Sequence, residues 1–258
     1  ADVAAVGRGL RRLAGLQRLY VNLGGCVNLA EVGALAEGLR CLEALESLYL
    51  SFRRCTSLGD VTPIGHALER LLVLRKLNIS FKDCTLLTGI EAICRAAGRL
   101  PALGELTMDL SGCTGLSSVA ALAGAGVPLG LEDLTVYFNG STALTDFSLG
   151  RAAAELPSLR ALTLSFTNCG ALACLTALGE ELGGLAALRD LSLYFYGCGA
   201  LEDVADLCGG LVQLAALRSL SLLTLFGLPD LPAPAAASLR AAASALEAAC
   251  SDANVLVR

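Results

Sequence analysis

The 258-residue chain contains no tryptophan, one histidine, one methionine and only 5% aromatic residues. The only imidazole, His66, lies between Gly65 and Ala67 at a predicted helix position on the convex side, so we do not expect it to serve as the base of a nucleophilic triad. Without a C-x-x-C pair or a second histidine we expect no zinc site. Charged residues make up 17% of the chain, 24 acidic against 19 basic, for a net charge of -5. This balance lacks the positive excess by which proteins attract nucleic acid or anionic membranes. We therefore expect no catalytic residues, no bound metal or cofactor and no nucleic-acid partner.

Long hydrophobic runs are also missing, although 55% of the residues are hydrophobic and the mean hydropathy is +0.65. The longest uncharged stretch, residues 110–131, contains five glycines, three serines, a threonine and a proline. Such a segment is too polar for a membrane-spanning helix. The first residues also lack the basic segment and apolar run of a signal peptide. We expect no transmembrane segment.

The chain contains instead an internal repeat of 28 or 29 residues. The segment LESLYLSFRRCTSLGDV is followed by LRKLNISFKDCTLLTGI, LGELTMDLSGCTGLSSV and further copies of the pattern L-x-x-L-x-L-x-F-x-x-C-x-x-L-x-x-V. A fixed period of this length is typical of solenoids, in which each unit buries its apolar face against its neighbours. The eight copies start at residues 16, 45, 74, 103, 131, 159, 188 and 217.

Each unit changes its hydrophobic period halfway along. Positions 4, 6 and 8 are apolar and alternate with polar residues, which predicts one half-buried strand per unit. After the cysteine the apolar residues are three or four apart, as at Leu29, Val32, Leu35 and Leu39, which predicts a helix of about three turns. We expect the side chains at positions 3, 5, 7 and 9 to form the exposed face of a parallel sheet.

These units resemble leucine-rich repeats. The spacing C-x-x-L-x-D, as in Cys55 to Asp60, is similar to that of cysteine-containing repeats, and the unit length is similar to that of ribonuclease-inhibitor-type repeats. The resemblance implies an α/β fold: a right-handed, horseshoe-shaped solenoid with a parallel β-sheet on the concave side and helices on the convex side. Relative to the family pattern, the strand is extended by one apolar–polar pair before the cysteine.

The expected solenoid covers residues 1–227 and consists of a half repeat, residues 1–15, followed by eight strand-bearing units. Residues 228–258 follow as a capping helix, from about 235 to 249, and a tail or short strand at 255–257. In the half repeat, Val3, Val6 and Leu10 match the helix positions of a preceding unit. We therefore expect further repeats or a partner to cover this amino-terminal end.

Eleven cysteines would permit disulfides, metal binding or thiol chemistry. Their number is odd, no C-x-x-C pair occurs, and six of them share position 11, where Ser141 and Gly227 stand in two other units. We interpret the six as a structural ladder of buried, weakly donating side chains at the turn that follows each strand. Reduced thiols predict an intracellular, reducing compartment, either cytoplasmic or organellar. The ladder residues are Cys26, Cys55, Cys84, Cys113, Cys169 and Cys198.

The exposed face of the predicted sheet carries basic residues in the second and third units, acidic residues in the fourth and fifth, and tyrosines towards the far end. Such a face suits a protein partner of matching polarity. The function we expect is a non-catalytic protein-interaction scaffold, within a longer chain or a complex. Two alternatives are a structural subunit of a large, membrane-associated assembly and the substrate-receptor arm of a ubiquitin ligase or signalling protein. The candidate partner-binding residues are Tyr20, Tyr49, Arg53, Lys82, Asp109, Tyr137, Asn139, Tyr194 and Tyr196.

Overall fold

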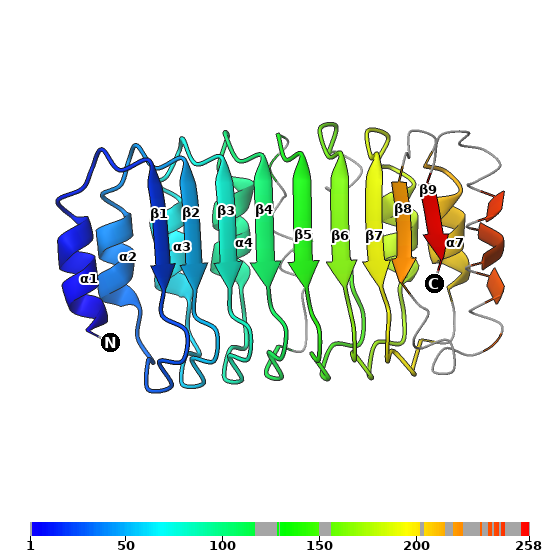
Figure 1. Ribbon diagram of the computed structural model, residues 1–258, viewed down its shortest axis with the longest axis horizontal. Coiled ribbons are helices and arrows are strands. Elements are labelled where there is room, and N and C mark those ends of the chain that lie inside the picture. The colour runs from blue at the N-terminus through cyan, green and yellow to red at the C-terminus, as the bar shows by residue number, and fades with distance from the viewer. Residues whose placement is uncertain are drawn as a thin grey trace.

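A computed structural model describes residues 2–116, 128, 130–149, 156–201, 204–214, 219–223 and 254–257, together with residues 233, 237–238, 240–242 and 244–245. Within this part of the chain, nine strands form one parallel sheet in chain order, and the strands stand side by side in Figure 1. The strands are β1 (Arg18–Asn22), β2 (Ser47–Ser51), β3 (Lys76–Ser80), β4 (Glu105–Asp109), β5 (Asp133–Tyr137), β6 (Ala161–Ser165), β7 (Asp190–Tyr194), β8 (Ser219–Leu223) and β9 (Asn254–Val257).

The register of the sheet follows the repeat. Tyr20 pairs with Tyr49, Tyr49 with Asn78, and so on along the sheet, so that equivalent positions of successive units lie side by side. Inward residues of the strands are buried: Leu48 is 1% exposed, and Leu50 and Phe52 are fully buried. The period of two in the sequence therefore predicted the inward and outward positions correctly.

Helices pack behind the sheet and cover one of its faces (Figure 1). Each presents the predicted apolar stripe to the core, as Leu35 and Leu39 do in the second helix. Where two helices meet, small residues allow backbone contact: a Cβ added at Gly65 would lie 2.5 Å from the Ala92 carbonyl carbon. The helices are α1 (Val3–Leu10), α2 (Gly33–Leu39), α3 (Thr62–Leu68), α4 (Glu91–Gly98), α6 (Thr176–Leu182) and α7 (Ala205–Leu211).

Phenylalanines at position 8, directly after each strand, form stacks in the core. The Phe52 and Phe81 rings lie 5.5 Å apart and nearly parallel, as do those of Phe138 and Phe166. Phe147 meets both members of the second pair edge-on, in a geometry that aromatic rings favour. The repeat thus aligns equivalent side chains into continuous columns.

The backbone ladder continues beyond the regular strands, which explains the extra apolar–polar pair of each unit. The Phe52 N–H donates to the Ser80 oxygen at 2.8 Å, and the Arg54 N–H donates to the Lys82 oxygen at 2.7 Å. At position 10 the chain then turns with a positive φ. Glycine adopts this conformation without strain; four of these seven described positions are glycine and three are larger residues. The residues with positive φ are Gly25, Arg54, Asp83, Gly112, Gly140, Asn168 and Gly197.

The fold is thus the expected α/β leucine-rich-repeat solenoid, with one correction: the described sheet has nine strands, whereas the repeat predicted eight. Residues 254–257 pair with β8 and supply the ninth strand. This pairing satisfies backbone groups that an edge strand at β8 would leave open. Of the predicted capping helix, residues 237–238, 240–242 and 244–245 are helical, while the rest of it and the predicted boundary at 228 lie outside the described residues.

No described helix combines the length and the apolar composition that crossing a membrane requires. The described helices of the repeats have seven or eight residues each, and they pack one stripe against the sheet.

Candidate binding surface

The exposed face of the sheet is divided by charge. On β1–β3 and the two residues that follow each strand, the outward positions carry basic side chains and no carboxylate. On β4–β7 the same positions carry carboxylates and no basic side chain. We call these the basic half and the acidic half of the sheet face. The basic residues are Arg18, Arg53, Lys76 and Lys82, and the acidic residues are Glu105, Asp109, Asp133 and Asp190.

The two halves meet between β3 and β4. There Lys76 Nζ lies 2.6 Å from Glu105 Oε1, and both side chains are more than half exposed. Burial is the main cause that raises the pKa of Asp133, and the neighbouring carboxylates Glu105 and Asp190 raise it further. The hydrogen bond that the Thr135 hydroxyl donates to this carboxylate lowers the pKa and offsets part of the rise. The carboxylates of the acidic half therefore repel one another, and a cation placed among them would relieve that repulsion.

Tyrosines occur at both ends of the sheet face. The Tyr20 and Tyr49 rings stack at 4.2 Å with an interplanar angle of 4°, and Tyr20 is 66% exposed. Tyr137 and Tyr194 are half-buried in the acidic half, beside the exposed Tyr196. Burial is the first cause that raises the pKa of Tyr137, followed by the fields of Tyr194, Asp109 and Asp133. Tyr137 therefore lies in a region of negative potential.

Two of the candidate residues, Asp109 and Asn139, are occupied by hydrogen bonds within the sheet. Asp109 Oδ1 accepts the Ser111 N–H at 3.1 Å. Asn139 Oδ1 accepts both the Thr167 N–H at 3.0 Å and the Ser165 hydroxyl at 2.6 Å. Both residues are half-buried and hold the turn that follows the strands. Arg53 is exposed and Lys82 is half-buried, at the opposite end of the face.

Sequence reasoning did not single out Arg18, Asp190 or Ser165. The first two occupy position 3 of their units, one of the outward positions that the repeat defines, so their place on the face was available from the spacing. Ser165 is only 5% exposed although it points outward, and its role depends on the larger residues beside it.

Five of the six position-11 cysteines form one line near the C-terminal ends of the strands. Each donates its thiol hydrogen to the position-8 carbonyl of the preceding unit; Cys84, for example, lies 3.1 Å from the Phe52 oxygen. Ser141 stands in the same line and donates to the Leu110 oxygen at 3.1 Å. The remaining members, Cys55, Cys113, Cys169 and Cys198, make the same bond at 3.0 to 3.2 Å.

Burial raises the pKa of these thiols: that of Cys84, Cys113 and Cys198 to about 12, and that of Cys169 to about 11. A thiol held neutral by burial is a poor nucleophile and a poor metal ligand. Among the described residues, no group of three or more His, Cys, Asp or Glu side chains could hold a metal ion. His66 lies exposed on α3.

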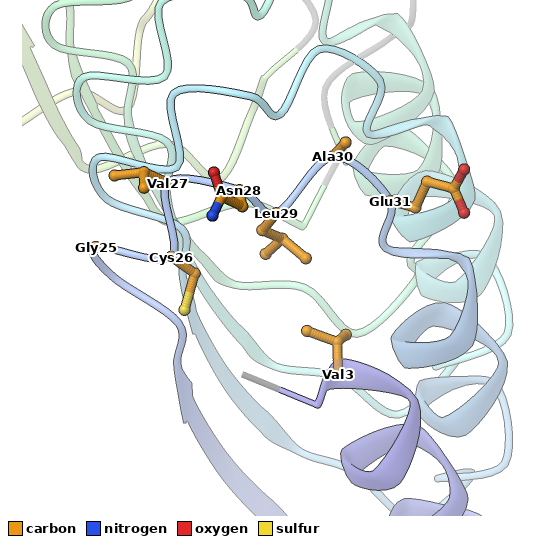
Figure 2. Close-up of a pocket in the computed structure, with 8 residues that line it drawn as sticks. All are labelled: Val3, Gly25, Cys26, Val27, Asn28, Leu29, Ala30 and Glu31. Atoms are coloured by element: carbon orange, nitrogen blue, oxygen red, sulfur yellow. The ribbon is translucent and has the colours of Figure 1, made fainter.

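The first unit leaves part of its core open. A pocket of about 620 Å³ lies between Val3 of α1 and residues 25–31, which include the half-buried Cys26 (Figure 2). Leu19 and Val21 are partly exposed in β1, whereas the equivalent Leu48 and Leu50 of β2 are buried. This apolar end of the solenoid is a second candidate surface.

Among solved structures, the chain is similar to internalin C2 of Listeria monocytogenes str. 4b F2365, with 20% identity over 85% of this chain and 92% of that chain, and a TM-score of 0.44. It is similar to a chain of a TLR13–ssRNA13 complex, with 19% identity over 86% of this chain and 36% of that chain, and a TM-score of 0.36. An internalin (InlF) of the same Listeria strain has 17% identity over 86% of this chain and 81% of that chain, and a TM-score of 0.27. No protein-family model and no curated protein matches the chain.

Proposed function

We propose that the protein is a non-catalytic binding module that recognises another protein on its sheet face. The observation that supports this proposal is the separation of charge on that face, with bases alone on β1–β3 and carboxylates alone on β4–β7. Charges placed only for solubility would not need to be sorted by sign. Sorted charges favour one orientation of a partner whose own charges have the opposite order.

The size of the face suits such a partner. From β1 to β7 it spans about 29 Å across the strands and about 20 Å along them, or about 580 Å² per partner, at strand spacings of about 4.8 Å and rises of about 3.3 Å. Stable specific complexes bury about 600 to 1,000 Å² per partner, so this area lies just below that range and suits a transient complex. The parallel sheet holds its side chains at fixed spacing, so that little conformational entropy is lost on binding.

Affinity capture from native extract tests the proposal. The bait is the full chain, compared with a Tyr137→Ala/Tyr194→Ala/Tyr196→Ala variant and with an Asp133→Lys/Asp190→Lys variant that breaks the sorting of charge. A third variant, Arg95→Ala, changes an exposed residue of α4 behind the sheet. We expect partners of the parent and of the helix variant to be lost from both sheet variants. Unchanged recovery of every partner by the sheet variants would refute the sheet-face proposal.

The same proposal includes two further expectations. The partner is a protein and not a nucleic acid, because phosphates would be repelled by the acidic half; filter binding with single-stranded RNA at low salt measures this. The protein works in a reducing intracellular compartment, where its thiols stay unpaired. Labelling free thiols in intact cells, followed by lysis and fractionation, tests that expectation.

The apolar amino-terminal end supports a second candidate function, that of a subunit in a larger assembly. Leu19, Val21 and Leu29 pack against the core and stay partly exposed, and a partner subunit would bury them. Under this hypothesis the native protein sediments as part of a complex, and Leu19→Lys releases it. A monomer with the same mass for parent and variant would exclude the assembly.

A further inference from the structure

A pocket of about 520 Å³ lies where the basic and acidic halves of the sheet face meet. It is at the amino-terminal ends of β3 to β6. Arg75 and Lys76 line it on the side of β3, and Glu132 and Asp133 line it on the side of β5. Gly104 lies between these two sides, directly before β4. We call this site the Gly104 pocket.

The glycine interrupts a column of long side chains. The Gly104 N–H donates to the Arg75 oxygen at 3.0 Å, and the Glu132 N–H donates to the Gly104 oxygen at 2.8 Å, so Gly104 is the direct neighbour of both residues. Because Gly104 has no side chain, a gap remains between the side chains of Arg75 and Glu132. At the same position 2, the other described units carry Gln17, Glu46, Arg75, Glu132, Arg160 and Arg189.

The two sides of the pocket present opposite charges. Lys76 is paired with Glu105 at 2.6 Å, whereas none of the ion pairs in the described part of the chain includes Arg75, Glu132 or Asp133. Glu105 also raises the pKa of the half-buried Asp133, after burial itself, so a cation on this side would relieve repulsion. The pocket therefore suits a ligand that brings an anionic group to Arg75 and a cationic group to Glu132 and Asp133.

The width of the gap sets the spacing of these two groups. Arg75 and Glu132 are two strand intervals apart, about 9.6 Å between their Cα atoms. In an extended segment, adjacent residues point to opposite sides, residues two apart lie on one side about 6.6 Å from each other, and residues four apart are separated by about 13 Å. Only the spacing of two residues places both charges between the two sides of the pocket.

We propose that the Gly104 pocket binds an extended segment of the protein partner in which an acidic and a basic residue are separated by one residue. This proposal rests on the proposed function and specifies the partner sequence that the boundary of the two halves recognises. A segment with two acidic residues would be repelled by Glu132 and Asp133, and one with two basic residues by Arg75. A neutral segment would form neither ion pair.

Capped peptides test the pocket on the full chain. The probe is an acetylated, amidated heptapeptide with aspartate and arginine on either side of one alanine, flanked by Gly-Ser pairs. Its analogues carry two aspartates, two arginines, or asparagine and glutamine. Binding is followed by the amide NMR signal of Gly130, a residue that lines the pocket. At low salt we expect the aspartate–arginine peptide to bind about threefold more tightly than each analogue, within the up to about fivefold that one exposed ion pair supplies.

A variant that fills the gap is the main test. A Cβ added at Gly104 would approach only the Arg75 oxygen, at 3.9 Å, and other units carry long side chains at this position. Gly104→Leu should therefore fold and weaken binding of the aspartate–arginine peptide by at least about fivefold, because both ion pairs are lost. Gly170→Leu adds the same side chain at an exposed glycine with open space in the turn after β6, and should leave binding unchanged.

A second variant tests the charges without filling the gap. Arg75→Glu makes both sides of the pocket acidic, so the peptide with two arginines should become the tightest ligand. Circular dichroism and the urea midpoint establish that each variant is folded. The proposal is overturned by equal binding of all four peptides, by no response at Gly130, or by an order of affinities that Arg75→Glu leaves unchanged.

The pocket and the proposed function fail separately. Partners that are captured equally by the parent, Gly104→Leu and Arg75→Glu would refute the pocket alone. Binding of the aspartate–arginine peptide that Gly104→Leu abolishes, with no protein captured from native extract, would refute the proposed function alone.

Discussion

Replacing Cys84 with serine tests the thiol ladder through the pH dependence of stability. Cys84 is fully buried, and its thiol donates to the Phe52 oxygen. Ser141 makes the equivalent bond in its own unit, so the serine hydroxyl in Cys84→Ser can keep this hydrogen bond. Because a satisfied buried hydroxyl costs little, we expect the variant to lose at most about 1.5 kcal/mol of unfolding free energy at pH 7.

The difference between the two chains grows at alkaline pH. Burial raises the pKa of Cys84 from 9.0 to about 12. Below pH 9 the thiol is protonated in both folded and unfolded chains, so its full contribution to the unfolding free energy is present. Between pH 9 and about 12 the unfolded chain loses this proton while the folded chain keeps it. The unfolding free energy then falls by about 1.4 kcal/mol per pH unit for each such thiol.

Cys84→Ser removes one of the buried thiols that titrate in this range. In urea titrations followed by circular dichroism at pH 8.0, 9.5 and 10.5 under reductant, its unfolding free energy should fall less steeply than that of the parent, by about 1.4 kcal/mol per pH unit. Cys174→Ser, which changes an exposed thiol, is the matched control and should follow the parent. Equal alkaline slopes for Cys84→Ser and the parent would refute a ladder of buried, protonated thiols.

Three further predictions concern the backbone and the other thiols. Gly210→Ala should cost about 1 to 3 kcal/mol by overpacking, because the added Cβ would overlap the Gly179 carbonyl, whereas Gly209→Ala in the same helix has open space and should gain up to about 1 kcal/mol in urea unfolding. Arg54→Gly should raise the thermal midpoint, because Arg54 holds a φ of 60° that costs a non-glycine residue about 1 to 2 kcal/mol; an unchanged or lower midpoint would contradict this. In native alkylation with mass readout, Cys174 should react before Cys84, and modification in the reverse order would show that the ladder is open.

The strands and their register could be predicted from the sequence because both follow from one period. A residue at position 4, such as Leu48, repeats 29 residues later as Leu77, and stacking whole units pairs the two. Ladder positions were predictable for the same reason. The strand at 254–257 carries no copy of the repeat, and its sequence allowed either a strand or a tail. Its pairing depends on whether the chain brings residues 254–257 back to the edge of β8, and the local sequence pattern does not specify this.

The internal role of Asp109 and Asn139 could not be read from spacing either. Both occupy outward positions, which predicts exposure. Yet the Asp109 carboxylate accepts the backbone N–H of Ser111, two residues ahead, and the Asn139 amide oxygen accepts the backbone N–H of Thr167, one strand away. Short polar side chains compete with water for such local donors, and the outcome depends on their rotamers. An outward position therefore fixes the side of the sheet on which the Cβ atom lies, but it does not determine which groups the side chain contacts.

The position-7 column shows how one backbone serves both stability and recognition. Its residues share the same strand geometry, so the size of each side chain decides what reaches the surface. Ser51, Ser80 and Ser165 are 5 to 9% exposed, whereas the larger side chains of Tyr137 and Tyr194 are only half-buried. The core columns at positions 4, 6 and 8 are unaffected by that choice, because they point to the other side of the sheet. Exchanging a serine and a tyrosine in this column should therefore move the exposed aromatic surface along the sheet without altering the fold that displays it.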